Sequence, residues 1–188
     1  MDLLLANLPT LAALMATGIV AGLLAGFLGV GGGIVIVPVL YFLFQSFGVS
    51  EQSAVLIATA TSLATIVPTS LSSIKSHHTL GNVDFPLLRS WSVFILLGVL
   101  CGSLLVTKFG GLWLSALFGM VAMFAALNIL IRTKTTTMTH TLPSKFGQSI
   151  IASLIGFFSS MVGIGGGTFS LPVLSAFNYS TPKAVGTA

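Results

Sequence analysis

Long apolar stretches alternate with short polar segments along the chain. Stretches without a charged residue or a histidine cover residues 3–44, 52–74, 90–107, 109–131 and 146–182. A helix needs about 20 apolar residues to cross the hydrocarbon core of a bilayer, so 52–74, 90–107 and 109–131 each predict one transmembrane helix. Because none of the stretches alternates as barrel strands do, we predict an all-α integral membrane protein built as a polytopic helical bundle.

The two longest stretches each contain a glycine run, and the runs match. Residues 29–40 read GVGGGIVIVPVL and residues 163–174 read GIGGGTFSLPVL, at an offset of 134 positions. Gly22 recurs as Gly156 at the same offset. A glycine pattern followed each time by the same proline favours an internal duplication over chance similarity between apolar segments.

The duplication continues with a shift and then stops. Residues 58–62 (ATATS) resemble residues 184–188 (AVGTA) at an offset of 126, so the second copy is eight residues shorter between its proline and its threonine. We therefore predict a first transmembrane repeat over 1–132, a cytoplasmic linker over 133–145, and the start of a truncated second repeat over 146–188. A complete protein of two repeats would have roughly 260 residues.

The positions of the cations predict how the repeats are oriented. Segments 75–89 and 132–145 together carry five Lys or Arg residues, whereas the turn between the intervening spans has Lys108 alone. The positive-inside rule places both cation-rich segments, and Lys183 with them, in the cytoplasm. If 3–44 enters the membrane and returns, an odd number of passes separates the glycine runs and the repeats are inverted. If 3–44 crosses only once, the repeats are parallel.

The composition restricts the class of protein. Only 5% of the residues are charged, and the mean hydropathy is +1.09. A chain so poor in charge cannot cover a water-facing surface, which excludes a soluble domain and a disordered tail. The net charge of +4 comes from a few loop cations, so we expect the lipid bilayer as a partner and no nucleic acid.

The glycine runs are the candidate binding site. Glycine weakens a helix interior by about 1 kcal/mol relative to Ala, so the first run should end a helix over residues 10–28 and start a shorter one over 33–47. Broken backbone at membrane depth persists only where protein covers it or where it lines a cavity. Interruptions at matching positions of two halves point to a transporter site. The alternative is close helix packing, which we assign to Gly18, Gly22 and Gly26.

A small anion is the ligand that such a site favours. The predicted spans contain no charged residue, so the ligand would be held by backbone N–H groups at helix starts and by neutral hydroxyls. The candidate substrate-binding residues are Gly31, Gly32, Gly33, Thr59, Thr61, Ser62, Gly165, Gly166, Gly167, Thr168, Ser170 and Thr187. Each hydroxyl has a plainer explanation too, a hydrogen bond to its own or a neighbouring helix.

Taken together, the motifs resemble those of a known family. The pattern GxGGGxxxxP occurs twice, ATATSL follows at 58–63, and His77-His78 precede GNVD at 81–84. This combination is similar to the TauE/SafE sulfite exporters of bacterial inner membranes. The resemblance implies a multi-pass transporter of sulfite, organosulfonates or other sulfur-containing anions, and it favours export.

Other functions have weaker support from the residues. The sequence has no dinucleotide fingerprint, P-loop, zinc-ligand spacing or buried catalytic histidine, so we predict no enzyme, no cofactor and no metal site. The alternative to transport is a membrane assembly protein, a half-transporter that needs a second copy or a complementing half. His77, His78 and Asp84 are candidate gating residues at the cytoplasmic interface, where Asp84 either pairs with Arg89 or is solvated alone.

Overall fold

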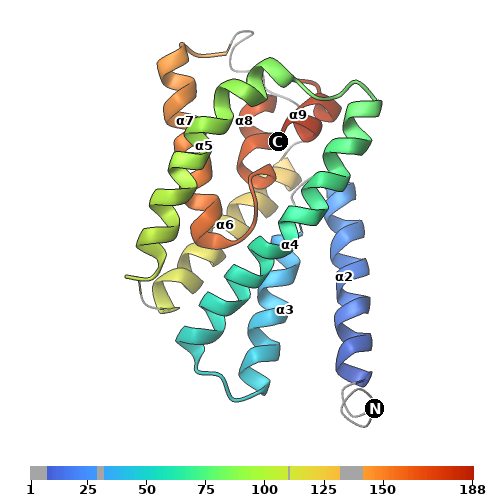
Figure 1. Cartoon of the computed structure of the whole chain (residues 1–188), viewed down its shortest axis with the longest axis vertical. Coiled ribbons are helices and arrows are strands. Elements are labelled where there is room, and N and C mark those ends of the chain that lie inside the picture. The colour runs from blue at the N-terminus through green and yellow to red at the C-terminus, as the bar shows by residue number, and fades with distance from the viewer. Residues whose placement is uncertain (1–7, 29–31, 110, 132–141) are drawn as a thin grey trace.

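The computed structural model describes residues 8–28, 32–109, 111–131 and 142–188, and every regular element among them is an α-helix (Figure 1). The helices are α2 (Leu8–Leu28), α3 (Gly33–Ser46), α4 (Glu51–Thr79), α5 (Phe85–Val106), α6 (Gly111–Ile131), α7 (Lys145–Val162), α8 (Gly167–Ala176) and α9 (Thr181–Thr187). Within the described residues, α4, α5 and α7 are long and apolar enough to cross a membrane. The predicted all-α class is confirmed.

Apolar side chains cover the outside of the bundle, and small residues fill the contacts inside it. Leu104, Leu112 and Leu130 are 72%, 77% and 78% exposed, whereas Ala54 and Ala152 are fully buried. An apolar surface of this extent is a liability in water, but in hydrocarbon it is the solvated surface. Small residues let neighbouring helices approach closely there. This distribution is that of a helical membrane protein.

The most extensive helix contact joins α5 of the first repeat to α7 of the second. Glycines bring the two backbones together, because a Cβ atom on Gly98 would overlap the carbonyl oxygen of Ser153, and one on Gly156 would overlap that of Ile95. In membranes such close packing replaces the hydrophobic driving force that lipid tails do not supply. The two repeats are therefore held together by glycine-mediated packing.

The connection between α4 and α5 covers only residues 80–84, not the predicted 75–89. Lys75, His77 and His78 consequently lie in the last turns of α4 instead of in a loop. The prediction was wrong because the length of a charge-free stretch reflects the thickness of the hydrocarbon core and not the full length of the helix. A helix can continue beyond that thickness into the polar interface.

The eight-residue difference between the repeats divides equally between two helices. α3 has 14 residues and α8 has 10, so α3 is about one turn longer. The turns that follow, 47–50 and 177–180, have the same length. The other four residues form an additional turn at the start of α4. Thr61 is the eleventh residue of α4, whereas its counterpart Thr187 is the seventh residue of α9.

The turns in the two hairpins, α3–α4 and α8–α9, have the same backbone. Gly48 and Asn178 are both left-handed, with φ of 80° and 65°. The next N–H in each turn donates to the carbonyl five positions back, from Val49 to Phe44 and from Tyr179 to Leu174, both at 3.1 Å. A left-handed Gly or Asn is a common way to end a helix. The turns align at an offset of 130, midway between the offsets of 134 and 126.

Corresponding helices of the two repeats run in opposite directions. In Figure 1, α2 rises from the N-terminal end and α3 descends, whereas α7 descends and α8 rises. The described helices between the two glycine breaks are α3 to α7, an odd number, which matches the alternative in which 3–44 enters the membrane and returns. The arrangement of the helices is thus that of inverted repeats.

Candidate functional site

The two glycine breaks contact each other. Gly33, the first residue of α3, lies against the backbone of Gly163 and Ile164, where α7 has just ended. A Cβ atom on Gly33 would overlap the Gly163 carbonyl oxygen and lie 2.5 Å from the Cα of Ile164. Ile164 is fully buried. The breaks predicted separately from the sequence therefore form one junction.

The backbone of the second break requires glycine. Gly163 ends α7 with a φ of 72°, and Gly165 has a φ of 85°. Residues with side chains rarely adopt these angles. Space is restricted as well, because a Cβ atom on Gly163 would lie 2.9 Å from Cγ2 of Thr59.

Helices α3 and α8 both begin on glycines that have no side chain to cap them. Gly32 and Gly166 are the N-cap residues, and both have a φ of −66°. Their carbonyls accept hydrogen bonds from the N–H groups of Ile36 at 3.0 Å and Ser170 at 2.9 Å. The N–H groups of a first turn have no acceptor within the helix, and they carry the positive end of its dipole. Such helix starts bind small anions.

Several predicted hydroxyl residues gather around the second break. Ser62 Oγ, fully buried on α4, donates to the Gly163 carbonyl at 2.7 Å. Thr59, one turn earlier, is buried against Gly163. Thr168 and Ser170 are buried on the first turn of α8. Thr61 is half-buried.

Three further residues complete the placement of the predicted set. Thr187 Oγ1 accepts a hydrogen bond from the Asp84 N–H at 3.0 Å, so this hydroxyl is engaged at the α4–α5 connection. The carbonyl oxygen of Ala188 lies 3.6 Å from a Cβ position on Gly166, so the end of α9 reaches the start of α8. Gly31 lies outside the described residues, and Gly167 is the first residue of α8.

Ser159 is a junction residue that sequence reasoning missed. It lies one turn before Gly163, and its carbonyl accepts the Gly163 N–H at 3.0 Å. Its buried Oγ has no hydrogen-bond partner among the described residues. At the offset of 134 its counterpart is Ala25, so the repeat gave no signal for it.

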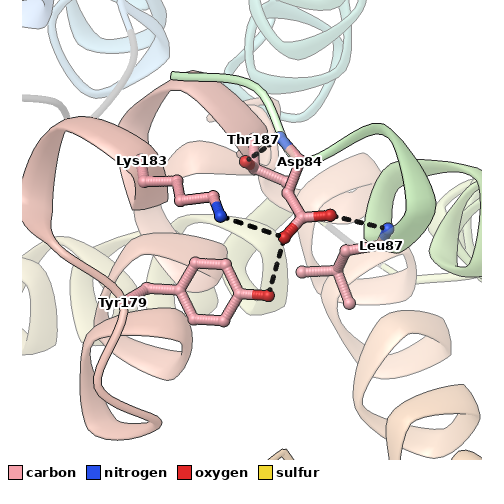
Figure 2. A network of polar contacts seen from close by, with 5 residues as sticks. All are labelled: Asp84, Leu87, Tyr179, Lys183 and Thr187. Carbon is pink, nitrogen blue, oxygen red and sulfur yellow. Dashed lines mark hydrogen bonds and ion pairs between the residues drawn. The ribbon is translucent and has the colours of Figure 1, made fainter. Parts of the chain in front are cut away.

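A polar network around Asp84 joins the α4–α5 connection to the α8–α9 hairpin (Figure 2). Asp84 Oδ1 accepts the Leu87 N–H at 3.2 Å, which caps α5, and Oδ2 accepts the Tyr179 hydroxyl at 3.0 Å. Lys183 Nζ lies 3.5 Å from the same Oδ2. Figure 2 shows that Tyr179 and Lys183 approach the carboxylate from the same hairpin.

The network lowers the pKa of Asp84 and raises the pKa of Tyr179. Burial by itself would raise the pKa of Asp84, but the bonds from Leu87 and Tyr179 and the charge of Lys183 outweigh it and hold this pKa below 3.8. Burial, together with the neighbouring carboxylate, raises the pKa of Tyr179 to about 12. The tyrosine hydroxyl therefore remains a donor at neutral pH.

Comparison with known proteins decides the family. The family model described as "Sulfite exporter TauE/SafE" matches residues 14–188. The chain belongs to the TauE/SafE family. No solved structure matches it.

The curated relatives of this TauE/SafE chain are longer than it is. It is 33% identical over 93% of its length to a protein of Haemophilus influenzae, and 28% identical over 92% to one of Methanocaldococcus jannaschii. A Bacillus subtilis protein is 27% identical over 93% of the chain. All three are named probable membrane transporter proteins. The chain spans 66%, 64% and 71% of their respective lengths.

The sequence left open whether Asp84 pairs with Arg89 or is solvated alone, and the structure of this TauE/SafE chain shows its partner. Asp84 pairs with Lys183 and not with Arg89. Lys183 thus lies on the same side of the bundle as the α4–α5 connection, as the cation count predicted. His78 packs edge-on against Phe85, with ring centroids 5.3 Å apart. A gating role for these residues stays a prediction.

Two other features of the TauE/SafE chain concern the ligands that it could bind. No cluster of three metal-ligating side chains occurs in the part of the chain that the structure describes. An apolar hollow of about 460 Å³ lies among α6, α7 and α8, and Phe124, Leu154 and Phe169 are part of its lining. A hydrocarbon group suits this lining and an anion does not. Anion binding at the glycine junction stays a prediction.

Proposed function

We propose that this chain carries the anion-binding junction of a multi-pass transporter of the bacterial inner membrane, which exports sulfite or organosulfonates. The contact of Gly33 with Gly163 and Ile164 carries the proposal, because it brings together two broken helices from opposite repeats. Both helices begin without a capping side chain. In transporters built from inverted repeats, discontinuous helices of this kind form the substrate site.

A junction of neutral hydrogen-bond donors suits the weak, reversible binding that transport needs. Backbone N–H groups and hydroxyls attract a small oxyanion without a lysine or arginine at membrane depth, where charge is costly. Binding must be weak enough for release on the far side. Because the donors belong to both repeats, a relative movement of the repeats would change the access to the ligand while the binding site stays assembled.

Ligand-dependent thermal unfolding tests the proposal on the purified chain. Trp91 and Trp113 provide the fluorescence signal. Sulfite and methanesulfonate should raise the melting temperature in detergent, and chloride at equal ionic strength should not. Gly166→Leu should abolish the shift, because the added side chain fills the space beside Ser170 and the Ala188 carbonyl without a Cβ clash.

A matched variant controls for the added bulk. Gly119→Leu places the same side chain in open space on α6, where no atom of the described residues lies within 4 Å of the Cβ position, and should keep the shift. The proposal fails if no oxyanion raises the melting temperature, or if Gly166→Leu responds like the parent chain. Sulfite flux from proteoliposomes, with and without a pH gradient, then tests transport itself.

A second candidate function is a half-transporter that works by assembly with another membrane segment. The observation that favours it is the exposed glycine face of α2, where Gly22 and Gly26 have open space beside them in the described structure. An assembly partner and an anion substrate are compatible, since the glycine face belongs to α2 and the junction is built from other helices.

A further inference from the structure

The three glycines of α2 that the sequence pattern assigns to close packing have no neighbours to pack against. No described atom lies within 4 Å of a Cβ position on Gly18, Gly22 or Gly26. Ile19 and Leu23, on the same side of the helix, are 63% and 69% exposed. A packing partner for these glycines is therefore not among the described residues, and their role in close packing stays a prediction.

The repeat identifies the contact that α2 lacks. Four exposed positions of α2 correspond to four positions of α7 whose backbone or side chain meets α5. At the offset of 134 the pairs are Ile19 with Ser153, Gly22 with Gly156, Leu23 with Phe157, and Gly26 with Ser160. On α7, Ser153, Phe157 and Ser160 lie against Gly98 and Gly102 of α5, and Gly156 lies against Ile95 of the same helix.

The buried side of α2 confirms the register of this correspondence. Ala21 is fully buried, and its counterpart Ile155 is buried on α7. The two helices therefore bury the same side in the bundle. They differ in the other side, which α5 covers on α7 and which no described residue covers at the glycines of α2.

We propose that the face formed by Ile19, Gly22, Leu23 and Gly26 binds a transmembrane helix of the α5 kind, supplied by a complete second repeat. This helix would be apolar, about as long as α5, and would carry small residues four positions apart, as Gly98 and Gly102 do. The length of the relatives leaves room for it, because this chain spans 66% of the Haemophilus influenzae protein.

A second copy of this chain fits the face less well. The glycine side of its α5 is already covered by α7, since a Cβ on Gly98 or Gly102 would overlap atoms of that helix. The proposed helix would run parallel to α2, because α5 meets α7 in parallel: Gly98 lies at Ser153, and Gly102 lies further along at Phe157 and Ser160.

Energy transfer with a synthetic α5 peptide, residues 85–106, tests the face on the whole chain. The chain carries Cys101→Ser and a donor dye at Leu8→Cys, and the peptide carries Cys101→Ser and an acceptor at one end. We expect saturable transfer in bicelles, stronger for an acceptor at the N-terminal end of the peptide than at its C-terminal end. Gly22→Leu in the chain should weaken the apparent affinity at least about tenfold, because close backbone approach is lost.

Two further variants keep the result specific. Val20→Leu changes an exposed residue whose counterpart, Leu154, faces the apolar hollow, and it should bind like the parent. Gly98→Leu in the peptide should weaken binding as much as Gly22→Leu in the chain. Equal binding by the Gly22→Leu chain, or no binding of the peptide at all, would overturn the proposal. So would Gly22-dependent transfer between two labelled copies of the chain without peptide, which would assign the face to a homodimer. None of these results depends on the anion, so failure here and failure of the transport proposal are distinguishable.

Discussion

The two hairpins, α3–α4 and α8–α9, share a backbone plan but are fastened differently. Both begin on an uncapped glycine and turn through a left-handed residue. Only the second is fastened by Asp84, through Tyr179 and Lys183, whose counterparts at the offset of 130 are Val49 and Ser53. Neither counterpart can supply a phenol or a cation. The two hairpins therefore share the path of the backbone, and they differ in the side chains at the positions of Tyr179 and Lys183.

The junction between the breaks shows the same inequality. Ser62 donates a buried hydrogen bond to the Gly163 carbonyl, and its counterpart in the second copy is Ala188, which has no hydroxyl. The first repeat therefore donates a side-chain hydrogen bond to the break of the second repeat, and the corresponding residue of the second repeat cannot donate one in return. In a transporter that alternates between two sides, such inequality would make the two states differ in stability.

The largest expected effect comes from Gly33, where the two breaks touch. Gly33→Leu should lower the free energy of unfolding by about 3–5 kcal/mol or prevent folding, because its Cβ meets the backbone of Gly163 and Ile164. Helix content against the mole fraction of sodium dodecyl sulfate measures this. Gly32→Leu is the matched control, since its Cβ meets only the flexible end of Ile36 at 3.2 Å. Equal losses for the two variants would contradict a packed junction at Gly33.

The fastening of the second hairpin should give the next largest effect. Asp84→Ala removes the α5 cap and the acceptor of the Tyr179 hydroxyl, which should cost about 2–3 kcal/mol. Lys183→Met should cost under about 0.5 kcal/mol, because the lysine side chain is 47% exposed and its ion pair is screened. The same unfolding series measures both, and a larger loss for Lys183→Met than for Asp84→Ala would refute this division.

The pH dependence provides an independent check on Asp84. A carboxylate whose folded pKa lies below 3.8 contributes its full stabilisation above that value and loses it as the pH falls through the folded pKa. The stability difference between the parent chain and Asp84→Asn should therefore be greatest at neutral pH and shrink below pH ~3.8. An unchanged difference at low pH would mean that the charge of Asp84 has no part in the fastening.

Removing the Ser62 hydroxyl should have a smaller effect. Ser62→Ala leaves the buried Gly163 carbonyl without this donor and should cost about 1–2 kcal/mol. Ser92→Ala, which removes an exposed hydroxyl bonded within its own helix, should cost less than about 0.5 kcal/mol. Chemical denaturation of the two variants side by side measures the difference, and similar midpoints would exclude Ser62 as a fastening of the break.

Exchanging the turn residues should have the smallest effect. Gly48→Asn and Asn178→Gly should each change stability by less than about 1 kcal/mol, because both residues tolerate a left-handed φ. Gly48→Val should cost more, since a β-branched residue is a genuine outlier there. Melting temperatures of the three variants test this, and equal shifts for Asn and Val at position 48 would contradict a shared turn geometry.

The sequence predicted the breaks well because glycine acts locally. The first break falls between Leu28 and Gly33, as expected, and the second between Val162 and Gly167. Local backbone preference and the repeat were enough to find both. The contact between the breaks could not be found in the same way, because contact between distant segments depends on how five intervening helices pack.

The remaining differences have tertiary causes. Lys183 is the partner of Asp84 although Arg89 is nearer in sequence, since the inverted repeat brings the α8–α9 turn over the α4–α5 connection. Ser159 gave no signal because it is one of several serines in α7 and its counterpart in the first repeat is Ala25. The placement of Thr187 beside Asp84 depends on the same packing. The roles of the site residues in binding stay predictions.

The equal division of the eight-residue difference has a consequence for how such hairpins can change in length. Four residues rotate a helix by about 400°, one turn plus about 40°, so a residue moved along by four still faces nearly the same neighbour. Two residues rotate it by about 200° and would point the threonine motif of α4 at lipid. An insertion or deletion in one arm also tilts the turn unless the other arm matches it. We therefore expect the length of this hairpin to change by four residues in both helices at once, which changes its depth in the bilayer in steps of about 6 Å.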